Sequence, residues 1–374
     1  MRLRQCSCAF LVAGALIALC CGSPASADVL TPRTSARPTP VLQRIVKLLV
    51  REGAPGALAE VRTRTRVRRA AAGVSQRQPR VGLRARDRFR AASITKSFVA
   101  TVVLELAAES KLSLDDTIEH WLPGLVPNGA AITLRELLNH TSGLFNYSEG
   151  AEWTPSVLAD PQRIWLPKEL IAVSAAHTPY FTPGTDWHYA NTNYVLLGLV
   201  IEAATGRSVG DELRDRIFQP LGLGETSFPA GVDASGLVHA YVGDATLPGV
   251  HGLWDITPVL NPSWLWAAGA LVSNADDVTT FYARLLSGRI LRADLVTAMR
   301  TVTPPAMNYG LGLMRFDTPC GRAFGHEGDF NGYRSVAVSR PNGSRVAVVM
   351  VNVDTTDISW EELDGAAERA VCSG

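Results

Sequence analysis

The chain has 374 residues, of which 47% are hydrophobic and 19% are charged, and its formal net charge is +1. This is the composition of a globular protein with a sizeable core, and the length suits one large domain or two smaller ones. The near balance of acidic and basic side chains argues against nucleic acid as the principal partner.

The N-terminal residues have the pattern of an export signal. Arg2 and Arg4 precede an apolar stretch, and Ala25-Ser26-Ala27 follows it as a cleavage site of small residues. We expect residues 1–27 to be a signal peptide, and the mature protein to be secreted into the cell envelope or beyond it. No later run reaches the roughly 18 apolar residues that a membrane-spanning helix needs, so we expect no transmembrane span.

Two of the six cysteines, Cys320 and Cys372, lie outside the expected signal peptide. An even pair in an oxidising compartment most simply forms a disulfide, which here would tie the C-terminal tail to the body of the fold. Two independent free thiols are the alternative. Within the leader, Cys20 and Cys21 leave open a lipid-anchored start, although Leu19 is a poor fit to such processing.

The first predicted elements are a helix and several strands. Residues 28–40 are rich in Pro, Ser and Thr, which predicts a disordered segment. Apolar spacing then predicts a helix over Val41–Glu52, followed by strands over Ala57–Val67, Arg68–Val74 and Asp87–Ala91. The alternating run Arg62-Thr63-Arg64-Thr65-Arg66 predicts a strand with one solvated face, with a basic edge for an anionic wall polymer as the alternative.

The pattern becomes helical from Ser93, and the stretch from about Leu112 to Trp264 is typical of helices and loops broken by Pro and Gly. Strands are predicted again near the end of the chain, over Arg322–Asp329, Tyr333–Arg340 and Arg345–Asp354. Pro341-Asn342-Gly343 predicts a hairpin turn between the last two, and Ile358–Val371 a closing helix.

Strands therefore flank a largely helical middle. We expect an α/β (α+β) fold in which both ends of the chain build one antiparallel sheet and the helical region forms an inserted lobe. A catalytic cleft would lie between the two lobes. The expected single domain is 41–374, with a sheet lobe of 41–105 and 268–374 and a helical lobe of 106–267.

Three short motifs carry side chains suited to nucleophilic catalysis, and the first is Ser93-Ile94-Thr95-Lys96. Positions i and i+3 of a helix share one face, so Ser93 and Lys96 can point into one cleft. Serine needs a base within hydrogen-bond reach, and a lysine can serve when burial keeps it neutral. A helix start here would also favour negative charge on an attacked carbonyl oxygen. Taken alone, the motif is also that of an ordinary helix-capping serine.

The second motif is Tyr189-Ala190-Asn191. A phenol near an ammonium loses its proton more easily and can relay protons to a leaving group. The amide of Asn191 both donates and accepts, so it can hold a lysine and a substrate amide together. The alternative is an aromatic packing residue beside a turn.

The third motif, His326-Glu327-Gly328, opens a predicted strand. A strand beside the nucleophile can supply a backbone N–H to an oxyanion and can pair with an extended substrate. Gly328 would let a ligand approach the backbone closely. A structural histidine is the alternative.

Together and in this order, the three motifs resemble those of the penicillin-recognising serine hydrolases, the group of the class C β-lactamases and the Streptomyces-type D-alanyl-D-alanine carboxypeptidases. The resemblance covers nearly the whole mature chain and implies a β-lactamase/transpeptidase-like antiparallel sheet flanked by helices. It includes the further runs Leu137–Leu144, Ala267–Leu271, Tyr309–Leu313 and Phe324–Gly328.

The resemblance implies an acyl-enzyme cycle that needs no metal or organic cofactor. Ser93 would attack a carbonyl group with Lys96 as the proton acceptor, and the backbone N–H groups of Ser93 and Asp329 would form the oxyanion hole. Tyr189 would protonate the leaving amine and later activate water. The histidines and mature cysteines show no metal-ligand spacing.

Other residues have supporting roles in the same resemblance. Asn191 would position the substrate amide, His326 would support Tyr189 and the pocket wall, and Trp264 would line the pocket. His140 would organise the loop from Thr141 to Leu144.

The third motif departs from the carboxypeptidases of this group. Glu327 and Asp329 stand where those enzymes have hydroxyl residues, and Met314 stands where they have an arginine. Two carboxylates near the pocket would repel an anionic substrate end unless an arginine offsets them, the candidates being Arg315, Arg322 and Arg334. A neutral ester or an amine-bearing amide would be less affected.

We therefore expect a secreted D-alanyl-D-alanine-carboxypeptidase-like hydrolase that acts on a small peptide or acyl substrate, such as a peptidoglycan stem peptide. β-Lactams would be covalent inhibitors or substrates. One alternative is an esterase, β-lactamase or D-aminopeptidase-like amidase that uses the same nucleophile. Another is a non-catalytic module that binds wall peptides.

Overall fold

The computed structural model describes residues 33–34, 39–229, 231, 235–243, 252–355 and 357–373. The expected signal peptide lies outside these residues. Within the segment 28–40, Arg33–Thr34 form a short strand, β1, which pairs in parallel with β3 (Arg66–Gln76). Most of the expected disordered segment 28–40 lies outside the described residues, so its disorder stays a prediction.

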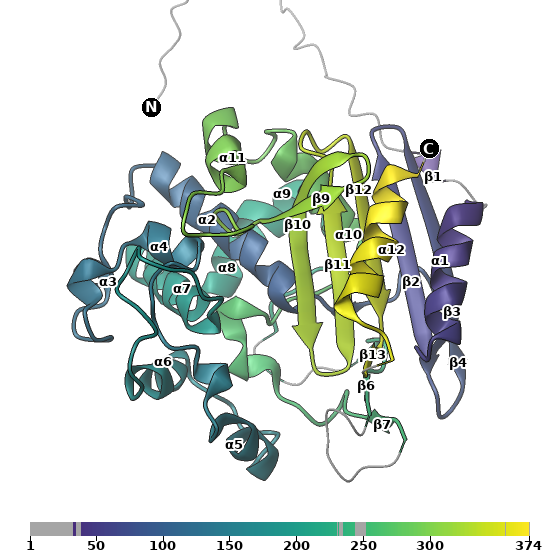
Figure 1. Cartoon of the computed structure of the whole chain (residues 1–374), viewed down its shortest axis with the longest axis horizontal. Helices are drawn as coiled ribbons and strands as arrows, with labels where there is room; N and C mark the ends of the chain where they lie inside the picture. The colour runs from purple at the N-terminus through teal and green to yellow at the C-terminus, as the bar shows by residue number, and fades with distance from the viewer. Residues whose placement is uncertain are drawn as a thin grey trace, which may run out of the picture. The chain divides into compact units, whose positions relative to one another are not determined.

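Both ends of the chain build one sheet, which is antiparallel apart from β1 (Figure 1). The strand order is β1-β3-β2-β12-β11-β10-β9, and β4 pairs with β3. Early and late segments meet at its centre, where Ala59 of β2 lies opposite Val349 of β12. This arrangement confirms the predicted fold class. The remaining strands of this sheet are β2 (Gly56–Thr63), β4 (Val81–Gly82), β9 (Met314–Thr318), β10 (Gly321–Phe330), β11 (Tyr333–Ser339) and β12 (Arg345–Val351).

Two turns test the sequence patterns directly. The turn between β11 and β12 contains Pro341-Asn342-Gly343, and Gly343 has a φ of +65°, which favours glycine. The arginine run was predicted as a strand, but β2 ends at Thr63 and β3 begins at Arg66. That prediction is wrong because the run crosses a hairpin turn, and Arg62 forms an ion pair with Asp276 instead of facing solvent.

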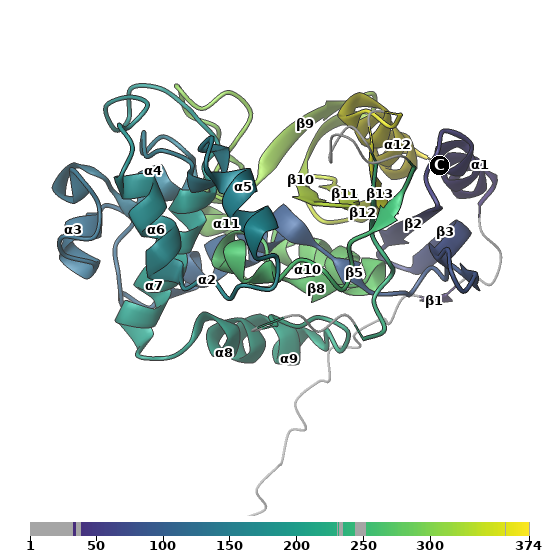
Figure 2. The ribbon, with the colours of Figure 1, turned by 90° about the horizontal axis from the view of Figure 1, so that it is seen from below.

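Helices cover both faces of the sheet (Figure 2). On one face lie α1 (Pro40–Arg51) and α12 (Trp360–Cys372), and on the other lies α10 (Ala275–Leu286). Helix α1 starts where Thr39 caps the N–H of Leu42, and it buries Leu42, Ile45, Val46 and Leu49 against the strands.

The inserted region is mostly helical, as the sequence predicts. The nearly fully buried helix α2 (Thr95–Ala108) packs against α7 (Asn191–Thr205) at its centre. Residues Pro32–Gly374 form one compact unit, and no helix in the described part of the chain is long and apolar enough to span a membrane. The other helices are α3 (Ile118–Trp121), α4 (Leu134–Leu138), α5 (Trp153–Ala159), α6 (Pro167–Ala175), α8 (Val209–Leu213), α9 (Gln219–Leu221) and α11 (Ala293–Arg300).

Short strand pairs join the sheet region to the helical region. β5 (Phe89–Arg90) pairs with β8 (Val272–Ser273), immediately before the segment that carries Ser93. A second small sheet has the order β13-β6-β7, formed by β6 (Tyr241–Val242), β7 (Trp254–Asp255) and β13 (Val353–Asp354).

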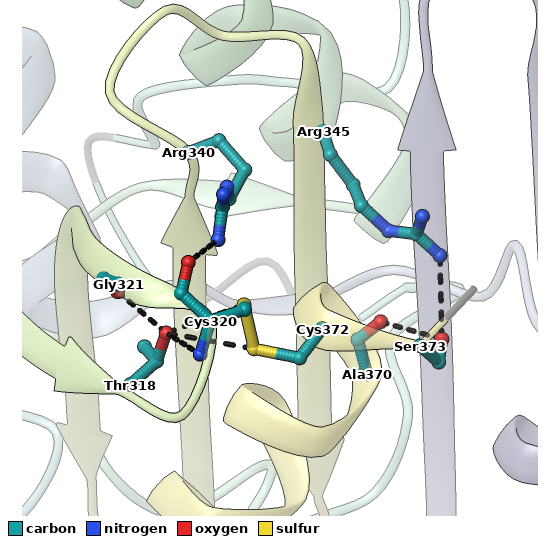
Figure 3. The surroundings of a disulfide bond; sticks show 8 residues. All are labelled: Thr318, Cys320, Gly321, Arg340, Arg345, Ala370, Cys372 and Ser373. Atoms are coloured by element: carbon teal, nitrogen blue, oxygen red, sulfur yellow. Dashed lines mark hydrogen bonds between the residues drawn. A yellow bond between two sulfur atoms is a disulfide. The ribbon is translucent and has the colours of Figure 1, made fainter.

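Cys320 and Cys372 form a disulfide, the pairing that the sequence predicts, and their Cα atoms are 5.7 Å apart (Figure 3). The bond joins the turn before β10 to the last residue of α12. The backbone N–H of Cys320 donates to Oγ1 of Thr318 at 3.3 Å, and Arg340 donates to the carbonyl oxygen of Cys320. The C-terminal helix is thus fixed covalently to the strands that carry the third motif.

Candidate active site

Ser93 lies in a single helical turn, Ala92–Ile94, between β5 and α2. Ala92 has a φ of +48°, a left-handed conformation that costs a non-glycine residue about 1–2 kcal/mol. Hydrogen bonds hold the segment in place: the N–H of Ala91 donates to Leu271 at 2.8 Å, and Oγ1 of Thr95 donates to the carbonyl oxygen of Ala92 at 2.6 Å. This strained turn presents Ser93 to a cavity in the wall of the molecule.

Lys96 follows one turn later and is fully buried. Its Nζ atom lies 3.0 Å from Oγ of Ser93, 2.8 Å from Oδ1 of Asn191 and 2.7 Å from the carbonyl oxygen of Ala268. Burial holds the pKa of Lys96 well below its usual value. A neutral amine can donate to Asn191 and Ala268 and can accept the hydroxyl proton of Ser93 with its lone pair.

Tyr189 contacts both of these residues. Its ring centroid is 4.8 Å from Nζ of Lys96, and its side chain hydrogen-bonds with Ser93. The sequence predicts a phenol that loses its proton easily, but burial raises the pKa of Tyr189 well above its usual value. The prediction is wrong because burial disfavours the charged phenolate, and a neutral Lys96 supplies no positive charge to stabilise it. Tyr189 is therefore suited to donate a proton to a leaving group.

Asn191 is the first residue of α7 and is fixed on every side. Its backbone N–H donates to Oδ1 of Asn146 at 3.1 Å, and its Nδ2 donates to Oγ of Ser148 at 3.1 Å. Ser148 also lines the cavity. Asn146 and Ser148 were not predicted from the sequence, since neither belongs to a motif that marks it.

His140 holds the segment that carries Tyr189. Its Nδ1 accepts the backbone N–H of Ala190 and the side-chain N–H of Asn193, each at 3.1 Å. The loop Thr141–Leu144 is held instead by other groups, such as Oγ of Ser142, which donates to Oδ1 of Asn193 at 2.6 Å. His140 thus organises the second motif more directly than its own loop.

His326 lies on β10 and is almost fully buried. Its Nε2 is 2.7 Å from the hydroxyl of Tyr309, and its Nδ1 is 2.6 Å from the carbonyl oxygen of Glu327. Burial, with a smaller effect of Lys96, lowers the pKa of His326 to about 3. The ring centroid of His326 is 6.3 Å from that of Tyr189, so His326 lies near Tyr189 while its hydrogen bond goes to Tyr309.

Gly328 has a different role from the predicted one. A Cβ atom at this position would lie 2.4 Å from the carbonyl oxygen of Ala91 and 2.6 Å from Oγ of Ser335. The glycine therefore lets β10 pack against the Ser93 segment, and no close approach of a ligand is needed to explain it. This contact brings the third motif to the nucleophile.

Several of these residues line a cavity of about 410 Å³. Ser93, Tyr189 and Asn191 belong to its lining, and so does Trp264, as the sequence predicts. Asp329, Asn331 and Asp354 form a polar end. The rest of the lining is mainly apolar and includes Trp153, Val157, Leu158, Val242, Ile256, Val259, Leu260 and Leu265. In the described residues, no group of three or more His, Cys, Asp or Glu side chains could hold a metal ion.

The family model described as Beta-lactamase matches residues 42–370. This chain belongs to the beta-lactamase family. Penicillin-binding protein 4* of Bacillus subtilis is 27% identical over 75% of this chain, and a D-aminopeptidase of Brucella anthropi is 31% identical over 84% of it. The chain spans 64% and 62% of the lengths of these two relatives.

Two solved structures match this chain over almost their whole length. A D-stereospecific amidohydrolase from Streptomyces sp. has a TM-score of 0.80 and 37% identity, covering 89% of this chain and 98% of that one. A D-amino acid amidase from Ochrobactrum anthropi complexed with D-phenylalanine has a TM-score of 0.80 and 27% identity, covering 89% and 99%.

The two carboxylates of the third motif have separate surroundings in this beta-lactamase family member. Glu327 hydrogen-bonds with Asp364 of α12, and burial together with the charges of Asp364 and Asp329 raises its pKa to about 8. Glu327 does not line the cavity within the described chain, so the expectation of two carboxylates at the pocket is wrong for this residue. Its side chain faces α12 instead.

Asp329 does line the cavity, and its side chain keeps contact with solvent there. It lies opposite Arg334 in the register of β10 and β11. The surrounding protein and the charge of Asp354 raise the pKa of Asp329 to about 6, while Arg334 opposes this rise. Asp329 therefore carries its negative charge at neutral pH.

The arginine candidates are placed differently from one another. Arg315 of β9 lies opposite Phe324 of β10 and forms an ion pair with Asp317 at 3.5 Å. Met314 of β9 lies opposite Gly325 of β10. Neither Arg315 nor the exposed Arg322 is among the described cavity-lining residues. Arg334 forms an ion pair with Asp354. It is therefore the one candidate placed to offset the carboxylates at the polar end.

Proposed function

We propose that this protein is a serine amidase that hydrolyses small amides of D-amino acids with a free α-amino group and a bulky apolar side chain. One observation carries the proposal: the cavity that Ser93 lines has a wall of apolar side chains and also contains the carboxylates Asp329 and Asp354. None of the described residues in its lining is a lysine or an arginine.

The apolar wall suits a large side chain on the acyl part of the substrate. Trp153, Leu260 and Trp264 offer aromatic and aliphatic contacts in the same cavity as the nucleophile. Burying a phenylalanine-sized side chain contributes roughly 1.5–3 kcal/mol. Such burial would also fix the direction in which the carbonyl group faces Ser93.

The polar end suits an ammonium group. The pKa of Asp329 is about 6, so above that pH a carboxylate is available to a protonated amine. The choice of D-configured substrates rests on the relatives, which include a D-aminopeptidase and a D-amino acid amidase.

The proposed reaction follows from the protonation states at the site. Lys96 accepts the proton of Ser93 as Oγ attacks the amide carbon, and Tyr189 gives its proton to the leaving nitrogen as the C–N bond breaks. Water then attacks the acyl-enzyme, with the same groups acting in reverse. The products are the free D-amino acid and an amine or ammonia.

D-Alanyl-D-alanine-carboxypeptidase activity is the alternative within the same family. Its substrate would bring a terminal carboxylate toward Asp329, where Arg334 is the one of the three candidate arginines placed to offset the repulsion. A peptidoglycan stem peptide is therefore the less favoured substrate. An esterase, a β-lactamase and a non-catalytic binding module are separated from the proposal by the same assay.

We also propose that residues 1–27 export the protein, which N-terminal sequencing of protein recovered from the medium would test.

The test compares matched substrates on purified protein. We expect turnover of D-phenylalanine amide, with little or none of its L-isomer or of N-acetyl-D-phenylalanine amide, because acetylation removes the ammonium. Asp329→Asn should raise KM for D-phenylalanine amide about tenfold with a smaller change in kcat. Ser93→Ala and Lys96→Arg should abolish turnover, since the first lacks the nucleophile and the second keeps a permanent charge.

The other outcomes name the competing functions. Turnover of a peptide ending in D-Ala-D-Ala, without turnover of D-phenylalanine amide, would establish a carboxypeptidase and refute the amidase. Turnover only of a nitrophenyl ester or a penicillin would indicate an esterase or a β-lactamase. Absence of both turnover and a covalent adduct on Ser93, measured by intact mass, would leave a binding module.

A further inference from the structure

The loop Tyr309–Leu313, immediately before β9, takes no part in the reaction proposed above. It is nevertheless fixed tightly: the N–H of Gly310 donates to Leu313 at 2.8 Å, and the N–H of Leu311 donates to Met299 at 3.1 Å. A Cβ atom on Gly310 would lie 2.1 Å from the carbonyl oxygen of Met299. The glycine therefore allows a close approach that places the buried side chain of Tyr309 behind the active site.

The hydrogen bonds of His326 determine where its ring proton lies. Nδ1 is 2.6 Å from the carbonyl oxygen of Glu327, which can only accept, so Nδ1 carries the hydrogen. The ring is neutral at ordinary pH because the pKa of His326 is about 3. Nε2 then has a lone pair, and the hydroxyl of Tyr309, 2.7 Å away, must donate to it.

The rings around this hydrogen bond form one contact group. The ring of Tyr309 lies 4.7 Å from that of His140 and 6.2 Å from that of Tyr189, measured between centroids. His140 accepts at Nδ1, so its hydrogen is on Nε2, and burial keeps its pKa low. The two histidines beside Tyr189 are thus held in opposite tautomers.

In the described part of the chain, the charged or titratable groups found around His326 are Lys96 on α2, Tyr189 before α7, His140 after α4 and Tyr309 itself. The carboxyl group of Glu327 pairs with Asp364 of α12. Tyr309 is the group among them that makes a hydrogen bond to Nε2.

We propose that Tyr309 is a positioning residue of this active site, whose hydroxyl donates to Nε2 of His326 and, together with the carbonyl oxygen of Glu327, fixes the tautomer and orientation of the imidazole beside Tyr189. Without that donor, Nε2 would be a buried acceptor with no partner, so the ring would be held through Nδ1 alone and would take up a proton more easily. Tyr189, which protonates the leaving group, would then pack against a less ordered His326 ring. The kinetic part of this inference rests on the proposed function, whereas the tautomer does not.

Tyr309→Phe tests the inference because it removes the hydroxyl and keeps the ring. Tyr282→Phe is the matched control: Tyr282 is fully buried and its hydroxyl pairs with Oγ of Ser97 at 2.9 Å. Oγ of Ser97 also donates to the carbonyl oxygen of Gly312, so the control concerns the same loop without touching His326. Folding of both variants is checked by circular dichroism and thermal unfolding.

Nitrogen-15 NMR of the histidine rings gives the direct measurement, with the His326 signals assigned by their loss in His326→Asn. We expect wild-type His326 to show a protonated Nδ1 and an accepting Nε2. In Tyr309→Phe, the Nε2 signal should shift and the pKa of His326 should rise by about one unit, because the lost hydrogen bond stabilised the neutral ring. We expect kcat to fall about 10- to 100-fold with KM within about threefold, and Tyr282→Phe to match the wild type.

The outcomes separate the two claims. Wild-type ring signals in folded Tyr309→Phe, or a wild-type kcat, would overturn the role of Tyr309. An equal loss of kcat in Tyr282→Phe would overturn it as well, because it would reflect general loosening of the loop. If the wild-type protein turns over no acyl donor, the proposed function fails, while the ring signals still decide the tautomer.

Discussion

Burial sets the protonation of the residues around Ser93. It lowers the pKa of Lys96 and of His326 and raises that of Tyr189, in each case because the charged form is removed from water. The base and the acid are therefore both neutral before reaction. Charge develops only when Ser93 attacks, at the point where fixed hydrogen-bond donors can stabilise it.

The pair Glu327 and Asp364 gives a pH-dependent prediction at the same scale. Their pKa values in the folded protein are about 8 and about 6, above the roughly 4 of carboxyl groups in an unfolded chain. The folded state thus binds more protons, so the free energy of unfolding falls as the pH rises from about 4 through 8. Glu327→Gln keeps a donor toward Asp364 without titrating, and it should reduce this fall by about 1–2 kcal/mol, since partial solvent contact screens the pair.

Urea unfolding at pH 5 and pH 8 measures the difference. Glu361→Gln is the control, because Glu361 is an exposed carboxylate on the same helix. It should leave the pH dependence of the wild type unchanged. An identical fall in Glu327→Gln and in the wild type would contradict a shared proton between Glu327 and Asp364.

Motif spacing accounts for the part of the site that could be predicted from the sequence. Ser93 and Lys96 share a helix face, so their proximity follows from local geometry alone, and the resemblance added Asn191. Ser148 lies in a short 3₁₀ helix, Tyr147–Glu149, which Asn146 precedes, and only tertiary packing brings this segment to Asn191. No local pattern could therefore have found them.

The orientation of Glu327 could have been predicted but was not. Successive residues of a strand point to opposite faces, so an inward His326 places Glu327 on the face covered by α12. Tyr309 is a similar case, because its motif was recognised without a role being assigned. For Glu327 the strand period carried the information, and for Tyr309 the glycine spacing of its motif did.

The main strands of the sheet were predicted because alternating runs near the N-terminus and valine-rich runs near the C-terminus mark them, whereas β9 was not predicted. The boundary between β2 and β3 was not predicted, because the alternation of arginines continues through the turn. Arg69 forms an ion pair with the fully buried Glu60 at 2.6 Å, and Arg62 bonds to Asp276 of α10. In the sequence, an arginine that forms such an ion pair looks the same as an arginine on a solvated strand face.

The packing of β10 against the Ser93 turn gives a prediction at the scale of elements. In Gly328→Ala, the added methyl group would meet the carbonyl oxygen of Ala91 at 2.4 Å, so β10 must move away from the nucleophile. We expect a loss of about 1–3 kcal/mol in stability and a loss of kcat of more than about 100-fold. Gly82→Ala is the control, because a methyl group there meets nothing within 4 Å. Retention of full activity in Gly328→Ala would show that this contact does not set the geometry of the site.

At the scale of the whole molecule, the two ends of the chain depend on each other. The N-terminal strands β2 and β3 complete a sheet whose other strands come from the last third of the chain. Helices α1 and α12, from opposite ends, cover the same face. Formation of the sheet must therefore await contacts of high sequence separation, whereas a covalent tie within the C-terminal part restricts only that part of the unfolded chain.

The disulfide between Cys320 and Cys372 provides that tie, across a sequence separation of 52 residues. Replacing both cysteines by serine should lower the free energy of unfolding by roughly 2–4 kcal/mol, chiefly because the unfolded chain regains freedom. The bond is not part of the described cavity, so kcat/KM should stay within about threefold of the wild type below the unfolding transition. Urea unfolding of the double variant and of the wild type, with and without a reductant, measures the loss. The reductant should lower the stability of the wild type alone, and a double variant as stable as the oxidised wild type would show that α12 is held by packing rather than by the bond.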